Sequence, residues 1–457
     1  MYRELHSLRQ ALQPELKDTL PPLTGVEPDK VLETYLNQLT GYVGLDVADQ
    51  TVTLLAINAN QEELGHLLEV PNAPPGYARI GDWLERLRVQ HHLRIIAVAC
   101  EATGVFYWSL WDYLAQRPNV ARVLYNPRTT EHMGAVLSKR VRTELVDARL
   151  LAEQLRLGST PEVVLTEDAD LLSARLCSRA ARDEAQSINR KKNQLRALIR
   201  GYNPAVSRVF PGAKFHHPAV YALLQQWVFP EEVVAAGVEA LTTILTKHSR
   251  SAFGADQAQT LVDQCRDLVS RPIRCEVVHQ RVNALIAAIG LTRQHQKALL
   301  KTGYALVKER PEAKLLKAST GAGISNTLAL VSEVGDIRRF PDGEHLASFL
   351  GLTTSKHISG TTIYQSKHIT KQGSPNGRYA AVNLAWHLSL RVPKYQTRYQ
   401  SIKARKPPRK GHRTALVAIA RDFVTDVLYD MWHDQRPFFV HVEDYRQYRR
   451  EHPRAKS

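Results

Sequence analysis

Short apolar segments alternate with helical ones between residues 41 and 157, and this alternation constrains the fold more than any other feature of the chain. Residues 42–47 and 51–57 have the pattern of two strands joined by a tight turn, as in a β-hairpin. The continuous apolar run at 93–100 is typical of a strand buried on both faces. The pattern therefore predicts an α/β domain. Its other expected elements are a strand at 122–125 and helices at 78–90, 107–116 and 144–157.

The rest of the chain has a helical pattern. Residues 166–200 contain neither Gly nor Pro and predict one long helix, to which residues 280–309 are expected to return antiparallel. We therefore expect a helical spacer or coiled coil in the middle of the chain, followed by a basic and mainly helical domain. The predicted domains are a helical N-terminal arm at 1–40, the α/β domain at 41–165, the spacer at 166–310, the basic domain at 311–435 and a charged tail at 436–457.

Positive charge is concentrated in one part of the chain. The formal net charge is +16, and residues 355–413 contain thirteen Lys and Arg but no Asp or Glu. A segment of this kind is typical of a surface that binds nucleic-acid phosphates, although a solvated surface remains the alternative. The candidate nucleic-acid-binding residues are Lys356, Lys367, Lys371, Arg378, Lys403, Arg405, Lys406, Arg409, Lys410 and Arg413.

Four acidic residues are expected near the carboxyl ends of strands, which is where an α/β sheet has its functional sites. Asp46 ends the first expected strand and Glu101 ends the central one, while Glu144 and Asp147 share one face of a helix. Four carboxylates in one cleft repel one another unless cations neutralise them, and Mg²⁺ or Mn²⁺ prefers such oxygen ligands. Two such ions support phosphodiester chemistry. For any single acid, a solvated strand end or helix face is the alternative.

The N-terminal half resembles the RuvC-like (RNase H-like) DEDD domain of the IS110 family of insertion-sequence transposases, which are bridge-RNA-guided recombinases. The resemblance rests on YVGLDVADQTVTLLAIN (42–58), ACEATGVF (99–106), VLYNPRT (123–129) and KRVRTELVDARLLAEQL (139–155). Asp46, Glu101 and Asp147 match the acids of that family, whereas Glu144 stands where Asp is usual. The longer glutamate side chain can change the metal distances.

The C-terminal half resembles the same family through STGAGISNTLALVSEVGDIRRFPDGEHLASFLGL (319–352) and the segment that follows it. The resemblance implies that Ser359 is the nucleophile; Ser355, Ser366 and Ser374 are the other serines of the segment. It also implies a composite site in which the serine meets the acids, a structured guide RNA, donor and target DNA, and a homo-oligomer, dimer or tetramer. On chemistry alone, Ser359 has the alternative of a plain serine in a Ser-Gly turn.

Other classes of protein share part of this pattern. A RuvC-like nuclease or junction resolvase uses the same acids without a serine, and a nucleic-acid-binding protein without activity needs only the basic domain. An actin-like or sugar-kinase ATPase needs Gly-rich phosphate loops, and the sequence has no GxxxxGK[ST] motif. The four cysteines form no CxxC pair, and no apolar run has the roughly 18 residues that span a bilayer. We therefore expect no membrane partner and a cytoplasmic, nucleoid-associated protein of a bacterium or archaeon.

Overall fold

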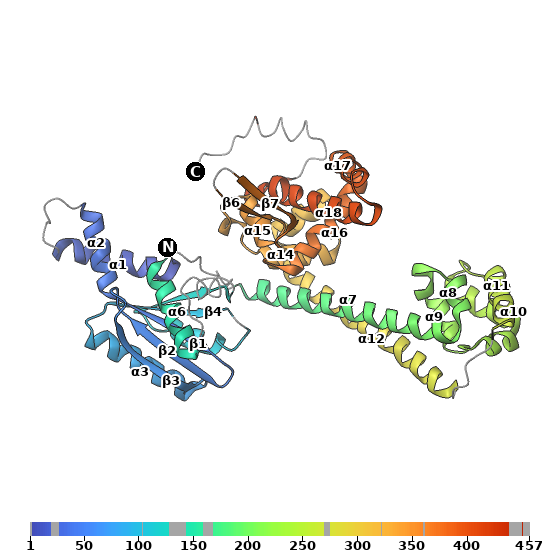
Figure 1. Cartoon of the computed structure of the whole chain (residues 1–457), viewed down its shortest axis with the longest axis horizontal. Coiled ribbons are helices and arrows are strands. Elements are labelled where there is room, and N and C mark those ends of the chain that lie inside the picture. Colours follow the sequence, from blue (N-terminus) through green and yellow to red (C-terminus); the bar gives the residue numbers. More distant parts are fainter. Residues whose placement is uncertain are drawn as a thin grey trace. The chain divides into compact units, whose positions relative to one another are not determined.

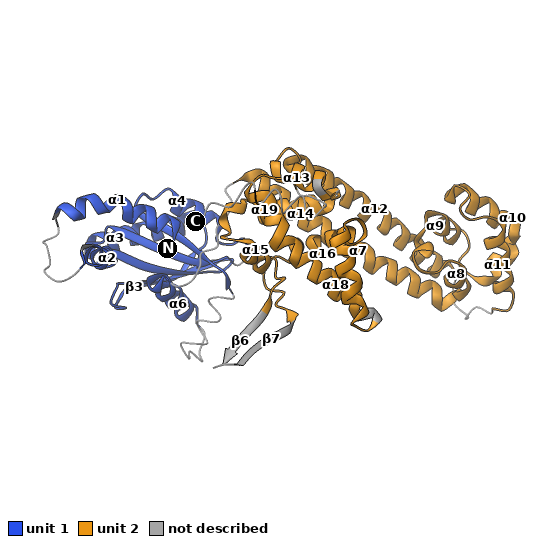
Figure 2. Ribbon diagram, turned by 90° about the horizontal axis from the view of Figure 1, so that it is seen from above, with its two compact units in different colours: residues 1–165 blue, residues 166–457 orange. Residues whose placement is uncertain are grey.

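The chain forms two compact units, residues 1–165 and 166–457 (Figure 2). The computed structural model describes residues 2–19, 27–102, 104–127, 143–158, 168–268, 275–320, 322–359, 362–437 and 450. Almost all of the predicted tail at 436–457 lies outside these residues. The finer division into five domains stays a prediction.

The first unit contains a five-stranded mixed sheet in the order β3-β2-β1-β4-β5 (Figure 1). Strands β1, β2 and β3 are antiparallel neighbours, whereas β4 runs parallel to both β1 and β5. This is the strand arrangement that an RNase H-like domain has. The strands are β1 (Thr40–Val47), β2 (Thr51–Ile57), β3 (Glu63–Pro71), β4 (Ile95–Glu101) and β5 (Val120–Tyr125).

Helices cover both faces of this sheet. On one face, Ile80 of α3 and Leu110 of α4 pack in the same core as Val98. On the other face, Leu5 of α1 and Leu151 of α6 pack in a second core. Alternate strand residues point to opposite faces, which explains why apolar side chains fill successive positions of β1 and β4. The helices are α1 (Arg3–Thr19), α2 (Pro28–Gln38), α3 (Pro74–Gln90), α4 (Trp108–Ala115) and α6 (Glu144–Leu157).

The α/β fold class predicted from the sequence is confirmed, and one strand of the first unit was missed. The expected helix at 144–157 has the observed bounds of α6, and each predicted strand has a counterpart. Strand β3 was not predicted because it lies at the edge of the sheet and most of its side chains are exposed or half-buried. An edge strand of this kind lacks the continuous apolar pattern of a central one.

Two long helices, α7 (Ala169–Tyr202) and α12 (Cys275–Val307), lie side by side in the second unit (Figure 1). The Nζ of Lys191 donates to Thr292 (3.0 Å) and the Nε2 of Gln296 donates to the carbonyl of Ala181 (3.3 Å). Residues with higher numbers on α12 thus pair with residues of lower number on α7. The two helices are therefore antiparallel, as predicted.

Shorter helices at the far end of this pair pack with α7 and α12 in one core, which includes Phe210, Phe229 and Leu261. They are α8 (Pro204–Val209), the 3-10 helix η1 (Gly212–His216), α9 (Pro218–Leu224), α10 (Pro230–Ser249) and α11 (Ala255–Arg266).

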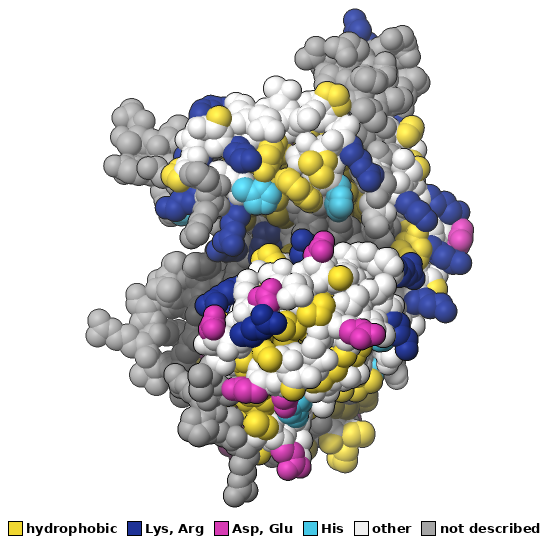
Figure 3. Space-filling model, turned by 90° about the vertical axis from the view of Figure 1, so that its right-hand side faces the viewer, with side chains coloured by type: hydrophobic (Ala, Val, Ile, Leu, Met, Phe, Trp, Pro, Cys, Tyr) yellow, Lys and Arg dark blue, Asp and Glu magenta, His cyan; other side chains and the backbone are white. Residues whose placement is uncertain are grey.

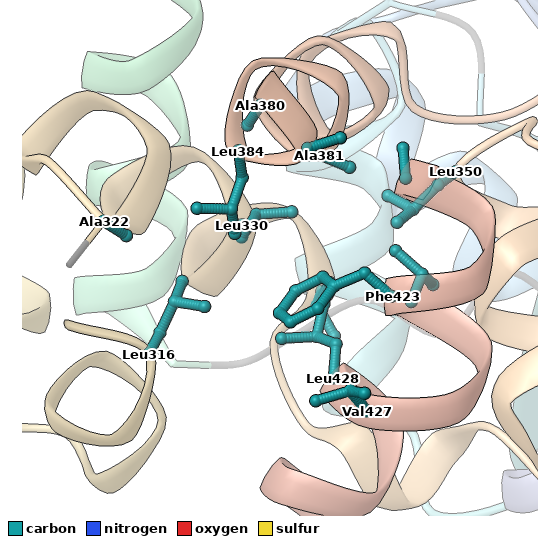
Figure 4. Close-up of a cluster of buried hydrophobic side chains, with 14 of the residues drawn as sticks. Leu316, Ala322, Leu330, Leu350, Ala380, Ala381, Leu384, Phe423, Val427 and Leu428 are labelled. Carbon is teal, nitrogen blue, oxygen red and sulfur yellow. The ribbon is translucent and has the colours of Figure 1, made fainter. Parts of the chain in front are cut away.

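The remainder of the second unit is mainly helical, as predicted, and has another core around Leu330, Leu384 and Phe423 (Figure 4). It also contains an unpredicted hairpin of β6 (Thr354–Ser359) and β7 (Thr362–Ile369), whose polar sequence gave no strand signal. No helix within the described residues is both long and apolar enough to cross a membrane. The helices are α13 (Pro311–Thr320), α14 (Ile324–Val334), η2 (Ile337–Arg339), α15 (Gly343–Phe349), α16 (Pro375–Arg391), α17 (Pro393–Ala404), α18 (Pro408–Phe423), the π-helical η3 (Val424–Leu428) and α19 (Tyr429–His433).

Candidate active site

Asp46 and Glu101 are neighbours on adjacent parallel strands. The register of β1 and β4 pairs Leu45 with Cys100, and the two acids each follow by one residue. Leu45 and Cys100 belong to the core beneath α3 and α4. Because strand residues alternate between faces, Asp46 and Glu101 belong to the opposite face, which α6 covers.

Helix α6 brings the other two acids to this face. Thr143 caps the helix by accepting a hydrogen bond from the Val146 N–H (3.3 Å), which places Glu144 and Asp147 in its first turn. Carboxylates are favourable at this end of a helix because they offset the partial positive charge of its free N–H groups.

Gly44 allows α6 to approach the sheet this closely. A Cβ built on Gly44 would lie 1.8 Å from the carbonyl oxygen of Ala148, a backbone atom that cannot move aside. Gly44 precedes Asp46 by two residues on β1, and Ala148 follows Asp147 on α6. The same close contact therefore sets the separation of the strand acids from the helix acids.

Thr53 fixes Glu144 to the sheet, and reasoning from the sequence missed it. Thr53 is buried, pairs with Asp46 across the β1–β2 hairpin, and its hydroxyl donates to the Glu144 carboxylate (2.8 Å). A threonine in an apolar strand is ordinary, and its partner lies 91 residues away, so the sequence carried no signal for this bond.

The four carboxylates interact electrostatically. Burial, followed by the negative charges of Asp147, Glu144 and Glu101, raises the pKa of Asp46 to about 6. The other three predicted acids are thus near enough to disfavour ionisation of Asp46. Within the described residues, no three His, Cys, Asp or Glu side chains already form a metal-binding group. The four acids are thus near one another, but their side chains are not arranged in a preformed metal cage.

The donor set nevertheless fits a hard divalent cation. Its members are all carboxylates, which are the ligands that Mg²⁺ and Mn²⁺ prefer, and a cation offsets the repulsion that raises the pKa of Asp46. Asp46, Glu101, Glu144 and Asp147 are the side chains that would hold it.

The four candidate serines lie in two places, the β6–β7 hairpin and the start of α16. Ser359 ends β6 and pairs with Thr362 of β7, next to the hairpin turn. Ser355 and Ser366 also lie in this hairpin, and the side chains of all three are outside the described part of the structure. Ser374 is different, because it is buried and caps α16 by accepting from the Gly377 N–H (3.0 Å). Ser374 therefore has a structural role.

The candidate basic residues occupy different environments. The guanidinium of Arg378 donates to the carbonyls of Leu350 and Lys371 (both 3.1 Å), and the guanidinium of Arg405, which follows the last residue of α17, donates to Ser401 of that helix. Lys371, Lys403, Lys406, Lys410 and Arg413 are exposed. The side chains of Lys356, Lys367 and Arg409 are outside the described residues. On the face shown in Figure 3, Lys and Arg side chains form groups in some places and lie beside Asp and Glu side chains in others.

Comparison with known families matches both halves of the chain. A DEDD-type transposase domain matches residues 43–204, which include all four acids of the site. A second domain, described as transposase of the IS116/IS110/IS902 family, matches residues 313–400 and includes Ser359.

Individual proteins are also similar to parts of this chain. An uncharacterised 43.6 kDa protein of insertion element IS110 from Streptomyces coelicolor is 26% identical over 302 residues, which cover 64% of this chain and 71% of that protein. An uncharacterised 44.8 kDa protein of insertion element IS116 from Streptomyces clavuligerus is 26% identical over 334 residues, or 69% of this chain and 77% of that protein. A pilin gene-inverting protein of Moraxella bovis is 30% identical over 133 residues, 29% of this chain and 40% of that protein.

The RNase H-like fold and its matched DEDD domain define a DNA transposase, an enzyme that cleaves and transfers DNA strands and requires a divalent metal. The chain belongs to the IS116/IS110/IS902 family of transposases. The family resemblance predicted from the sequence is thereby confirmed.

Proposed function

We propose that this transposase cleaves and rejoins DNA with two groups of residues, the acids Asp46, Glu101, Glu144 and Asp147 and the nucleophile Ser359, under the direction of an RNA encoded by its insertion sequence. The observation that carries the acidic half is the convergence of four carboxylates that raises the pKa of Asp46. The serine half is supported by the matched transposase domain at 313–400 and by the position of Ser359 beside a hairpin turn.

The role of the four acids would be to bind the divalent cation and hold it in place. Mg²⁺ or Mn²⁺, when bound, stabilises negative charge that develops on the phosphate oxygens. Thr53 keeps Glu144 in place by its hydrogen bond, and Gly44 keeps α6 against the sheet. Glu144 replaces the usual aspartate, and this bond to Thr53 is a means of positioning its longer side chain.

The serine would form a covalent link to the DNA. Its hydroxyl oxygen forms a bond to phosphorus, the bond from phosphorus to a sugar oxygen breaks, and the proton of the hydroxyl ends on that leaving oxygen. The energy of the phosphodiester is kept in the phosphoserine bond and is available for rejoining. A metal-dependent nuclease or junction resolvase, the nearest alternative, forms no such link.

Trapping separates these two mechanisms. Wild type and the variants Ser355→Ala, Ser359→Ala and Ser366→Ala are incubated with substrate DNA and co-expressed RNA, then denatured and examined for a protein–DNA adduct. The adduct is expected with wild type and should be missing only from Ser359→Ala, which should still bind DNA. Loss of the adduct in another serine variant would assign the nucleophile to that residue. Cleavage without any adduct would establish the nuclease alternative.

The RNA and the oligomer are tested together. The protein is purified from cells that carry the complete insertion sequence, and the bound nucleic acid is sequenced. We expect one defined RNA from the flank of the element and a dimer or tetramer by light scattering once donor and target DNA are added. A monomer that carries only random cellular RNA would contradict this part of the proposal.

A further inference from the structure

A polar pocket of about 310 Å³ lies within the second unit, and neither the acids nor the β6–β7 hairpin is part of its lining. Four helices contribute to it, namely α7, α12, α14 and α16. Its lining is of two kinds. Small side chains such as Ala181, Ala329 and Ala380 leave the space open, and polar or aromatic side chains surround it. This volume is at the small end of the range for ligand pockets.

The aromatic side chains of the pocket are unusually exposed. Tyr379 is 50% and Trp386 is 38% exposed, although both lie on a helix whose opposite face is buried in the core. The guanidinium of Arg182 lies over the Tyr379 ring, 5.0 Å from its centroid. Exposed aromatic rings next to an arginine are the usual stacking surface for nucleic-acid bases.

Amide side chains complete the pocket. Asn326, Asn376 and Asn383 line it together with Gln296. The amide of Asn376 donates to Ser178 (2.8 Å), so its position is fixed. Asn326 is only 9% exposed, and no residue in the described part of the structure hydrogen-bonds to its amide. Because Asn326 lines the pocket, its amide can hydrogen-bond to a ligand that carries donors and acceptors along its edge.

The charge of the pocket is positive. Among the residues that the structure describes, no Asp or Glu lines the pocket and none pairs with Arg182. Helix α14 begins beside it, with Ser325 and Asn326 in the first turn and no side-chain cap on Gly323. The first backbone N–H groups of this 11-residue helix therefore add partial positive charge. A phosphate would meet favourable charge here.

We propose that this pocket binds one unpaired nucleotide of a nucleic-acid strand, with the base against Tyr379 and Trp386 and the phosphate near Arg182. Base edges offer donors and acceptors to the amides of Asn326 and Asn383, and asparagine amides pair well with them. The inference rests on the function proposed above, and the strand is either the RNA or a DNA strand that has been separated from its complement.

Binding to short oligonucleotides tests the pocket. Full-length wild type, Tyr379→Leu, Tyr379→Phe, Arg182→Gln and Arg190→Gln are titrated into fluorescein-labelled single-stranded RNA and DNA of about twelve nucleotides, and the affinity is read from anisotropy. Tyr379→Leu and Arg182→Gln should weaken binding of one or both strands by about fivefold or more, which is the usual effect of losing one stacked base. The strand that responds identifies the source of the nucleotide.

The controls make the result specific. Tyr379→Phe keeps the ring and should bind as wild type does. Arg190→Gln removes the same charge from an exposed position of the same helix and should have a much smaller effect than Arg182→Gln. Because Tyr379 is half exposed, thermal melting should show all variants folded. A fully paired duplex, which offers no unpaired base, should bind equally to wild type and Tyr379→Leu.

The outcomes separate this inference from the proposed function. If Tyr379→Leu and Arg182→Gln bind both single strands as tightly as wild type, the pocket is not a nucleotide site, whatever the result of adduct trapping. If Tyr379→Leu and Arg182→Gln lose single-strand binding while Ser359→Ala retains the adduct, the pocket is a nucleotide site and the proposed nucleophile is wrong.

Discussion

Asp46 carries the clearest electrostatic signature of the site. Burial and three neighbouring carboxylates raise its pKa to about 6 from an ordinary value of 3.8. The folded state therefore binds the Asp46 proton more tightly than the unfolded state does. The contribution of this group to stability accordingly falls as the pH rises from about 4 to 6, and its cost is fully present above that range.

Replacing Asp46 should therefore separate stability from activity. At pH 7.5 without metal, Asp46→Asn should raise the free energy of unfolding by on the order of 1 kcal/mol, a value discounted because solvent screens a partly exposed group. At pH 4 this gain should disappear. The same variant should lose DNA cleavage, and Mg²⁺ should raise the melting temperature of wild type but not of Asp46→Asn.

Thermal melts at both pH values and a plasmid cleavage assay measure these effects. Asp112→Asn, at an exposed position of α4 in the same unit, is the matched control and should change neither melting nor cleavage. Wild-type cleavage by Asp46→Asn would exclude this residue from the metal site.

Glu333 presents the opposite case, because its buried charge is compensated. It is 1% exposed, and Arg179 donates two hydrogen bonds to it (2.7 and 2.8 Å). Burial alone would raise the pKa of Glu333, but Arg179, with help from Arg175 and Ser374, lowers it below 4.5. This stabilisation is present above the unfolded pKa and is lost as the pH falls through the lower, folded pKa.

Removing Arg179 should consequently destabilise the second unit by about 3 kcal/mol at pH 7, since it leaves a buried carboxylate without its partner. The difference between wild type and Arg179→Leu should shrink as the pH is lowered toward 4, because protonated Glu333 needs no counter-charge. Urea unfolding at several pH values measures it. For comparison, Lys314→Ala breaks an exposed pair with Glu309 and should cost less than about 1 kcal/mol. Equal losses in the two variants would show that burial of Glu333 is unimportant.

At the scale of elements, the contact between β1 and α6 determines the geometry of the acids. Gly44→Ala would force a Cβ against the Ala148 carbonyl. The helix must then shift away from the sheet, which should cost about 1–3 kcal/mol of stability and move Glu144 and Asp147 relative to Asp46. We expect cleavage to fall more than DNA binding does, as measured by turnover and by gel shift.

A glycine with free space provides the control for this change. Gly290 lies inside α12, and a Cβ there would meet no atom within 4 Å. Gly290→Ala should therefore stabilise the protein by up to about 1 kcal/mol through helix propensity and leave cleavage unchanged. If Gly44→Ala behaved like Gly290→Ala, the close approach of α6 would have no role in the site.

The elements that were predictable from sequence are those whose signal is local. Strand β4 is a continuous apolar run, and α6 combines a threonine cap with helical periodicity, so both were found. Strand β3 was missed because most of its side chains are exposed or half-buried, and the β6–β7 hairpin was missed because its sequence is polar. Asp46 and Glu101 were recognised as strand ends, whereas Thr53 and the pocket at Tyr379 depend on contacts between segments far apart in the sequence.

For the whole molecule, the uneven distribution of charge predicts how DNA binding depends on salt. Lys403, Lys406 and Lys410 are exposed in the segment that carries thirteen of the positive charges and no acid. Changing all three to Gln should lower the log–log salt slope of duplex binding by about 2.7, since each lost phosphate contact contributes about 0.9.

A control variant with three substitutions removes the same charge from Lys30, Arg88 and Lys314, which are already paired with acids. Filter binding between low and moderate salt measures both proteins. The control should keep the wild-type slope, because net charge alone does not release counterions from DNA. Equal slopes for the two triple variants would mean that the basic segment is a solvated surface and that another part of the chain contacts the phosphates.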